Sequence, residues 1–163
     1  MTAFRTKSHK TAGMTPGFDV DGSLGRLAKW LRIVGLDAEY PVGKPRPGRF
    51  FVTARSRVIG LWVIQVSGRS AVDQLAQVLA AADLRVDREL LFSRCLICNV
   101  PVEDVTGEQM LSSVPSEIAG HISAFTACPR CGRIYWAGTH LTRVLRRLAE
   151  SGLGFDPEDE GSE

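Results

Sequence analysis

The sequence has no long hydrophobic segment. No apolar run approaches the roughly 20 residues that a helix needs to span a bilayer. The N-terminal residues, MTAFRTKSHKTAGMTPG, are basic and polar and lack the apolar stretch of a secretory signal. Internal repeats are absent as well. We therefore expect a cytoplasmic protein that has no membrane partner.

Cysteine is scarce, with four residues in a chain of 163. Proteins of the cytoplasm seldom keep disulfides, so these cysteines need another explanation. All four fall into two C-x-x-C pairs: Cys95 with Cys98, and Cys128 with Cys131. Zn²⁺ prefers four soft ligands in a tetrahedron, and each C-x-x-C turn offers two thiolates. We predict that the two pairs together hold one structural zinc ion.

The residues that follow each pair support this prediction. Asn99 and Gly132 both tolerate the left-handed backbone that a metal-binding turn requires. Four protein ligands close the site, so the zinc would stabilise the fold and leave no open position for catalysis. A redox role for the C-x-x-C pairs is the alternative, although a redox pair is more often single and opens a helix.

Acidic residues are few in most of the chain and concentrate at its end. Residues 1–149 hold all 20 Lys and Arg but 12 of the 18 Asp and Glu, which gives this part a net charge of +8. Residues 150–163 hold six acids and no base. A body this basic suits an anionic partner such as nucleic acid. The alternative is an ordinary soluble surface with an acidic tail.

The apolar pattern predicts an α/β domain followed by a cysteine-bearing module. We expect strands at 18–20, 50–53 and 61–66, a further strand at 84–91, and a loop over the Pro- and Gly-rich residues 40–49. Helices are expected at 24–34, ending at Gly35, and after Ser70, which forms an S-x-x-D capping box with Asp73. A short helix at 115–123 and a closing helix that begins at 139 and ends at Gly152 complete the prediction.

These elements predict four regions along the chain. Residues 1–16 form a flexible leader, 17–91 the α/β domain, 92–150 the zinc ribbon with the closing helix, and 151–163 a disordered acidic tail.

Three segments, in order along the chain, resemble the Mut-seven C-terminal ribonuclease domain family: FDVDGSLGRLAKWLRIVGLD, RCLICN and CPRCGRIYWAGTH. Members of this family are PIN-like nucleases with a zinc ribbon at the C-terminus. The resemblance covers about residues 17–150. It implies a PIN-like three-layer α/β/α fold with a central, mainly parallel sheet, followed by a four-cysteine zinc ribbon. It also implies an endoribonuclease that uses Mg²⁺ or Mn²⁺ held by acids at the C-terminal edge of the sheet.

The resemblance assigns catalytic acids to two positions. Asp21 matches the first family acid, in D-G-x-L-G, and Asp73 matches an acid at the start of a helix; helix capping is the alternative role of each. The sequence departs from the family between Glu39 and Asp73, where it has no carboxylate, and Thr53-Ala54-Arg55-Ser56 stands where the family has T-R-D. A hydroxyl cannot replace a charged ligand of Mg²⁺. We therefore predict that cleavage is lost or strongly weakened.

A binding module of the same fold is the second hypothesis, and a protein-interaction domain is the third. The predicted RNA-binding residues lie on the first helix and on the ribbon: Arg26, Lys29, Arg32, Arg94, Arg130 and Arg133. Contacts of Arg and Lys with phosphates would make the affinity salt-sensitive. Tyr135 and Trp136 either stack on bases or belong to the core. A shortened sheet edge would also allow pairing with another chain, so an oligomer is possible.

Overall fold

The computed structural model describes residues 16–105, 125–136 and 138–154 of the chain. Its first part is a four-stranded, all-parallel sheet in the order β2-β1-β3-β4. The strands are β1 (Gly17–Asp21), β2 (Ala38–Val42), β3 (Arg49–Thr53) and β4 (Val63–Gln65). The α-helices are α1 (Gly25–Ile33), α2 (Ala71–Ala81) and α5 (Thr139–Glu150). The predicted α/β class with a parallel sheet is confirmed.

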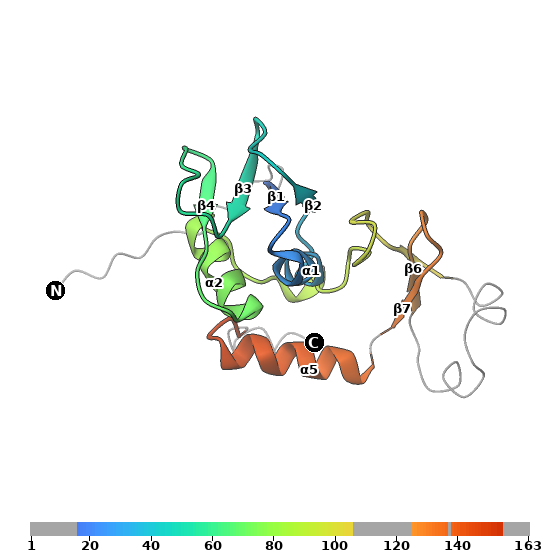
Figure 1. Ribbon diagram of the computed structural model, residues 1–163. Helices are drawn as coiled ribbons and strands as arrows, with labels where there is room; N and C mark the ends of the chain where they lie inside the picture. Colours follow the sequence, from blue (N-terminus) through green and yellow to red (C-terminus); the bar gives the residue numbers. More distant parts are fainter. Residues whose placement is uncertain (1–15, 106–124, 137, 155–163) are drawn as a thin grey trace.

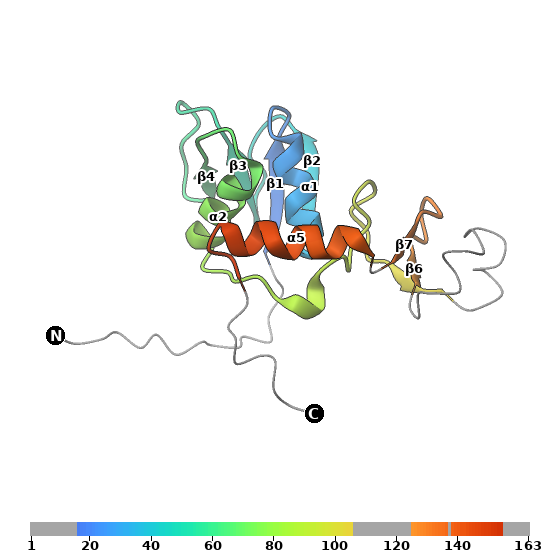
Figure 2. The ribbon, with the colours of Figure 1, turned by 90° about the horizontal axis from the view of Figure 1, so that it is seen from below.

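The helices form two layers below the sheet. Helices α1 and α2 lie between the strands and α5, and the two views agree on this order (Figures 1 and 2). Val144 and Leu148 of α5 are buried in the same hydrophobic cluster as Leu27 of α1 and Leu75 of α2. The closing helix therefore packs on the α/β domain, although it follows the cysteine-bearing module in the sequence.

Strand β1 separates apolar from acidic side chains by alternation. Phe18 and Val20 are fully buried in the hydrophobic cluster, whereas Asp19 and Asp21 project from the opposite face of the strand. Because β1 is central and buried on both sides, both carboxylates also lose most of their contact with water. Each therefore needs a hydrogen-bonding partner from the chain.

Two predicted helix boundaries are confirmed. Gly35, just beyond α1, has a φ of 84°, which an L residue with a side chain adopts only at a cost. At the start of α2, the Ser70 side chain accepts a hydrogen bond from the Asp73 amide at 3.3 Å. Such a cap stabilises a helix by about 1 kcal/mol.

Two predicted elements are wrong. The loop expected over 40–49 is shorter, because β2 extends to Val42 and carries Pro41 at the edge of the sheet, where the missing amide breaks no ladder bond. The strand expected over 84–91 is absent; this stretch holds the 3-10 turn η1 (Arg88–Leu90). Leu84 and Leu91 still pack against the core, which explains their apolar character without a strand.

The cysteine-bearing part is a small antiparallel sheet that lies beside the α/β domain (Figure 1). Its strands are β5 (Glu103–Asp104), β6 (Phe125–Ala127) and β7 (Ile134–Trp136). The helix predicted at 115–123, the leader up to residue 15 and the tail from residue 155 lie outside the described residues. Among the described helices, none is both long and apolar enough to cross a membrane.

Candidate functional site

The four cysteine sulfurs meet at one point. All four Sγ atoms lie within 4.8 Å of one another, and Cys95 Sγ lies 3.8 Å from Cys131 Sγ. Four thiolates placed about 2.3 Å from a zinc ion would have sulfur–sulfur edges of about 3.8 Å. The donor set and its spacing therefore fit a tetrahedral Zn²⁺ site, with Cys95, Cys98, Cys128 and Cys131 as ligands.

The two C-x-x-C turns have the same local geometry. In each, the amide of the second cysteine donates to the sulfur of the first, from Cys98 to Cys95 at 3.3 Å and from Cys131 to Cys128 at 3.4 Å. The following residue is left-handed, with φ of 61° at Asn99 and 71° at Gly132. The left-handed backbone predicted at these positions is confirmed.

The pKa values of Cys95 and Cys98 shift in opposite directions. Burial alone would raise the pKa of Cys95, but hydrogen bonds from the Tyr135 hydroxyl and from the amides of Cys98 and Ile97 outweigh it and lower that pKa to about 6. Burial and the neighbouring thiols raise the pKa of Cys98 to about 12. A coordinated thiol loses its proton outright. The cluster thus offers one thiolate readily, and ionisation of Cys98 depends on the metal.

The first cysteine turn is fastened to the α/β domain by Arg32. This arginine is buried, and its guanidinium donates to the carbonyl oxygens of Leu96 and Ile97 at 2.9 and 3.1 Å. It also donates twice to the Ala38 carbonyl at the start of β2, at 3.0 and 2.8 Å. Burial lowers the pKa of Arg32, and nearby carboxylates and thiols oppose that shift. The prediction that Arg32 lies on an exposed RNA-binding face is wrong, because its long side chain turns inward to join α1, β2 and the zinc turn.

Arg94 and Asn99, which flank this cysteine pair, serve the same attachment. Asn99 accepts a hydrogen bond from the Ala38 amide at 3.0 Å and donates to Asp37 Oδ1 at 2.6 Å. Arg94 donates to the carbonyls of Gly35 and Asn99 at 3.2 and 2.6 Å. The R-C-x-x-C-N segment is thus a joint between two parts of the fold, and the contacts of Arg94 are with backbone oxygens of the protein itself.

The predicted catalytic acid Asp21 stands at the C-terminal end of β1, and four donors surround its carboxylate. Oδ1 accepts from the Ser23 amide at 3.1 Å and from the Ser23 hydroxyl at 3.2 Å. Oδ2 accepts from Thr53 Oγ1 at 2.8 Å and lies 2.7 Å from Arg55 Nε. Burial would raise the pKa of Asp21, but the hydrogen bonds from Ser23 and Thr53 and the Arg55 charge hold it below its usual range. Asp21 is ionised at neutral pH, with both oxygens occupied.

The second acid of β1, Asp19, is fully buried and held by two arginines. Arg46 donates to both carboxylate oxygens, at 2.6 and 2.5 Å, and Arg49 Nε donates to Oδ1 at 2.6 Å. Arg49 also reaches Asp37 at 2.7 Å. Burial would raise the pKa of Asp19, and the hydrogen bonds and charges of Arg46 and Arg49 more than offset it. The carboxylate next to Asp21 on this face is therefore also occupied by guanidinium groups.

Asp73, the other predicted catalytic acid, lies on the surface at the first turn of α2. Its amide is capped by Ser70, and its carboxylate accepts a hydrogen bond from Ser151 beyond the end of α5 at 3.3 Å. Among the described residues, the four cysteines form the one group of three or more His, Cys, Asp or Glu side chains placed to hold a metal ion. The donors around Asp21 therefore do not fit a divalent metal site built from several carboxylates.

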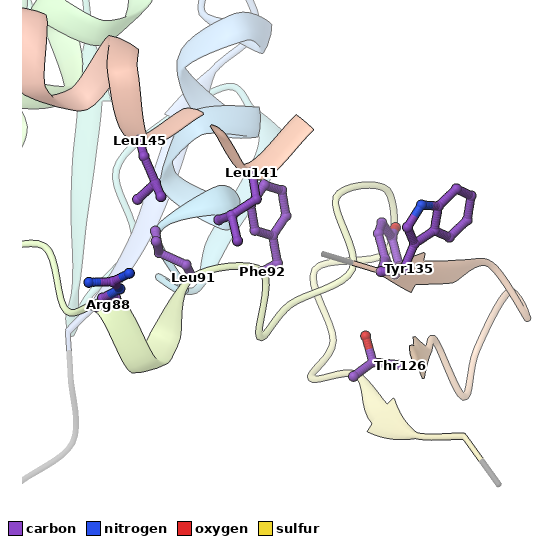
Figure 3. A pocket seen from close by; sticks show the side chains of 8 residues that line it. Arg88, Leu91, Phe92, Thr126, Tyr135, Leu141 and Leu145 are labelled. Atoms are coloured by element: carbon purple, nitrogen blue, oxygen red, sulfur yellow. The ribbon is translucent and has the colours of Figure 1, made fainter. Parts of the chain in front are cut away.

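The remaining predicted RNA-binding residues, Arg26, Lys29, Arg130 and Arg133, are exposed. The two aromatic residues of β7 have different environments. The Tyr135 hydroxyl forms hydrogen bonds with Cys95 Sγ and the Leu96 amide, both at 3.1 Å, whereas the Trp136 side chain is 40% exposed. Both line an open hollow of about 280 Å³ between the ribbon and α5 (Figure 3). Tyr135 thus has a structural role, and base stacking remains a prediction for Trp136.

The arginines around β1 are site residues that the sequence patterns did not predict. Arg46 and Arg49 lie in the segment expected as a loop, and Arg55 stands in the stretch without carboxylates. A signal was present, because two buried acids in a central strand require cationic or hydrogen-bonding partners, and these three arginines lie on the segment that follows β2.

Comparison with known families gives one match. Residues 16–148 match the family model described as the Mut7-C RNAse domain. Searches of curated proteins and of solved structures found no significant match. The matched span includes the parallel sheet, the cysteine cluster and most of α5.

Proposed function

The chain belongs to the Mut7-C RNAse domain family, and we propose that it binds RNA through this nuclease-like fold without efficient metal-dependent cleavage. The observation that carries the proposal is the occupation of Asp21 by Arg55, Thr53 and Ser23. A guanidinium stands 2.7 Å from the carboxylate oxygen that a divalent cation would need.

The alternative is displacement of Arg55 by the metal. The Arg55 side chain is 53% exposed, so its ion pair with Asp21 is not strong in itself. Displacement would nevertheless leave one carboxylate facing a hard cation, because the oxygens of Asp19 remain bound to Arg46 and Arg49. Mg²⁺ gives up its water ligands reluctantly and needs more oxygen donors than this edge supplies. We therefore derive no catalytic step through Mg²⁺ or Mn²⁺.

RNA binding is supported by the family and by the charge of the chain. Residues 1–149 carry a net charge of +8, and Arg26, Lys29, Arg130 and Arg133 are exposed. Such side chains attract the phosphate backbone and release its counterions. The zinc ion, bound by four thiolates, would keep the ribbon folded and take no part in chemistry. Trp136 would add a stacking contact from the ribbon.

A combined cleavage and binding assay tests this proposal. The zinc-loaded protein is mixed with end-labelled single-stranded RNA in Mg²⁺, in Mn²⁺ and without divalent metal, beside the Asp21→Ala variant. We expect salt-sensitive binding and no metal-dependent cleavage above the level of Asp21→Ala. Robust cleavage that disappears in this variant would contradict the loss of catalysis. Absence of RNA binding at low salt would contradict the binding function and favour a protein-interaction domain.

A further inference from the structure

A groove runs over the helical side of the molecule, from the sheet edge near Asp21 to the end of α5. One hollow, of about 420 Å³, opens beside Ser23 and Ala54 near the C-terminal edge of the sheet. A second hollow, of about 340 Å³, lies between α1, the start of α2 and the end of α5. Arg26, Arg69 and Ala71 line both hollows, so the two adjoin each other.

Three arginines from distant parts of the sequence line this groove. Arg26 comes from α1, Arg69 from the turn before α2, and Arg147 from the last turns of α5. All three are exposed, and none of their side chains forms a hydrogen bond or ion pair with another described residue. Glu150 is the one acid among the described lining residues, and its carboxylate lies 3.8 Å from Arg146. The lining thus carries a net charge of +2.

The groove arginines have no described ion-pair partner, which distinguishes them from the arginines at the sheet edge. Arg46, Arg49 and Arg55 already bind carboxylates, so an incoming phosphate would have to break an ion pair to reach them. Arg26, Arg69 and Arg147 would exchange only water for phosphate oxygens. A guanidinium recognises a phosphate with two parallel N–H donors, which makes arginine well suited to this contact.

We propose that this groove binds the backbone of single-stranded RNA, with phosphates at Arg26, Arg69 and Arg147. The inference rests on the proposed RNA-binding function and names the surface that performs it. Trp30, the aromatic residue of the lining, is 9% exposed and packs in the core, so it offers no free face for stacking. Recognition in the groove therefore depends on phosphates and is independent of base sequence.

The position of the groove also sets the path of the strand. Its first hollow is lined by Ser23, whose amide and hydroxyl bind Asp21. The RNA would pass next to the edge of the sheet that carries Asp21 and continue across α2 to α5. In this arrangement α5, which packs on the α/β domain, contributes directly to the binding surface (Figure 2).

Two double variants with equal loss of charge test the inference. Arg69→Ala/Arg147→Ala removes two groove arginines, and Lys44→Ala/Arg57→Ala removes two exposed charges that do not line the groove. Affinity for single-stranded RNA of mixed sequence is measured by anisotropy across a salt series, and thermal melting confirms that both variants fold.

We expect the groove variant to bind about tenfold more weakly or worse. Its log–log salt slope should flatten by about 1.4, since each of the two lost phosphate contacts on a single strand contributes about 0.7. The control variant should keep a slope within about 0.5 of the wild-type slope. Equal losses in the two variants would overturn the groove while RNA binding itself stands. No binding by the wild-type protein would overturn the proposed function and the groove together.

Discussion

Arginine side chains occupy three different environments in this protein. Arg46, Arg49 and Arg55 neutralise the acids of β1. Arg32 is buried among carbonyl oxygens, and Arg147 is exposed without a described side-chain partner. A planar group with five donors can meet all three demands, whereas lysine would satisfy fewer oxygens at each buried position. The chemical role of each arginine therefore follows from its partners in the fold.

The sequence shows which positions carry arginine, but sequence patterns could not predict which groups each arginine binds. The helical period correctly places Arg32 off the apolar stripe of α1, which made an exposed position the natural expectation. The structure buries Arg32 because β2 and the first cysteine turn fold over it, and contacts 64 and 65 residues away leave no local signal. Asp21, in contrast, could be located because it matches the D-G-x-L-G motif of the family after the first strand.

Acidification should weaken the ion pairs of the joint. The hydrogen bonds from Arg49 lower the pKa of Asp37 more than burial raises it, and Asn99 adds to the lowering. A lowered folded-state pKa stabilises the protein above the unfolded value of 3.8, and this contribution is lost as pH falls through the folded pKa. We expect the difference in unfolding free energy between wild type and Asp37→Asn to stay constant from about pH 7 to 5 and to shrink below about pH 4.

Denaturant unfolding of both proteins across this pH range measures that difference, and comparison of the two cancels the acid sensitivity that they share at the zinc site. A difference that grows on acidification would contradict the assignment of Asp37 as an ionised partner of Arg49.

At the scale of elements, the first cysteine turn supplies two of the four clustered cysteines and also holds the start of β2 in place by hydrogen bonds. Its residue Asn99 needs a left-handed backbone, accepts from the amide of Ala38 and donates to Asp37. The sequence could predict the turn geometry, since few residue types tolerate this φ. It could not predict the two side-chain bonds, which depend on where β2 ends up beside the turn. Strand β2 could not be predicted because it contains Pro41. A proline fits in this strand only because β2 lies at the edge of the sheet, where no hydrogen bond from the missing amide is needed.

Substitutions at Asn99 should separate these two roles. Asn99→Gly keeps the left-handed backbone but leaves the buried Ala38 amide without its partner, which costs about 2 kcal/mol of unfolding free energy. Asn99→Ala adds the strain of a left-handed alanine, about 1 kcal/mol more. Chemical denaturation of the zinc-loaded proteins measures both values. If the alanine variant were as stable as the glycine variant, backbone strain would have no part in the preference for Asn.

At the scale of the whole molecule, two parts with different sources of stability are joined. The α/β domain and α5 share a hydrophobic cluster that runs from Phe18 to Leu148. In its described residues the ribbon has two short antiparallel strand pairings and four converging cysteines, so we expect its folding to depend mostly on the metal. The contacts of Arg32, Arg94 and Asn99 connect the two. We therefore expect zinc binding also to stabilise the end of α1 and the start of β2.

Removal of zinc should reduce amide-exchange protection on both sides of this joint. On chelation we expect amide-exchange protection to be lost at Asn99 and Gly132, to fall at Ala38, and to persist at Phe51 and Val52 in the central sheet, because only the first three depend on the cysteine turns. Hydrogen exchange with and without chelator measures this pattern, and Cys98→Ser in the presence of zinc should reproduce it. Uniform loss of protection would show that the α/β domain cannot fold without the ribbon.

The proposed absence of a divalent-metal site rests on the guanidinium groups beside Asp19 and Asp21. It is tested most directly by titrating Mn²⁺ into the zinc-loaded protein and following the free ion by electron paramagnetic resonance, with Asp21→Asn as the matched control. The arrangement of Arg55, Thr53 and Ser23 around Asp21 predicts no Mn²⁺ site in the micromolar range and identical titrations for the two proteins. One Mn²⁺ bound per chain with micromolar affinity, and lost in Asp21→Asn, would contradict it.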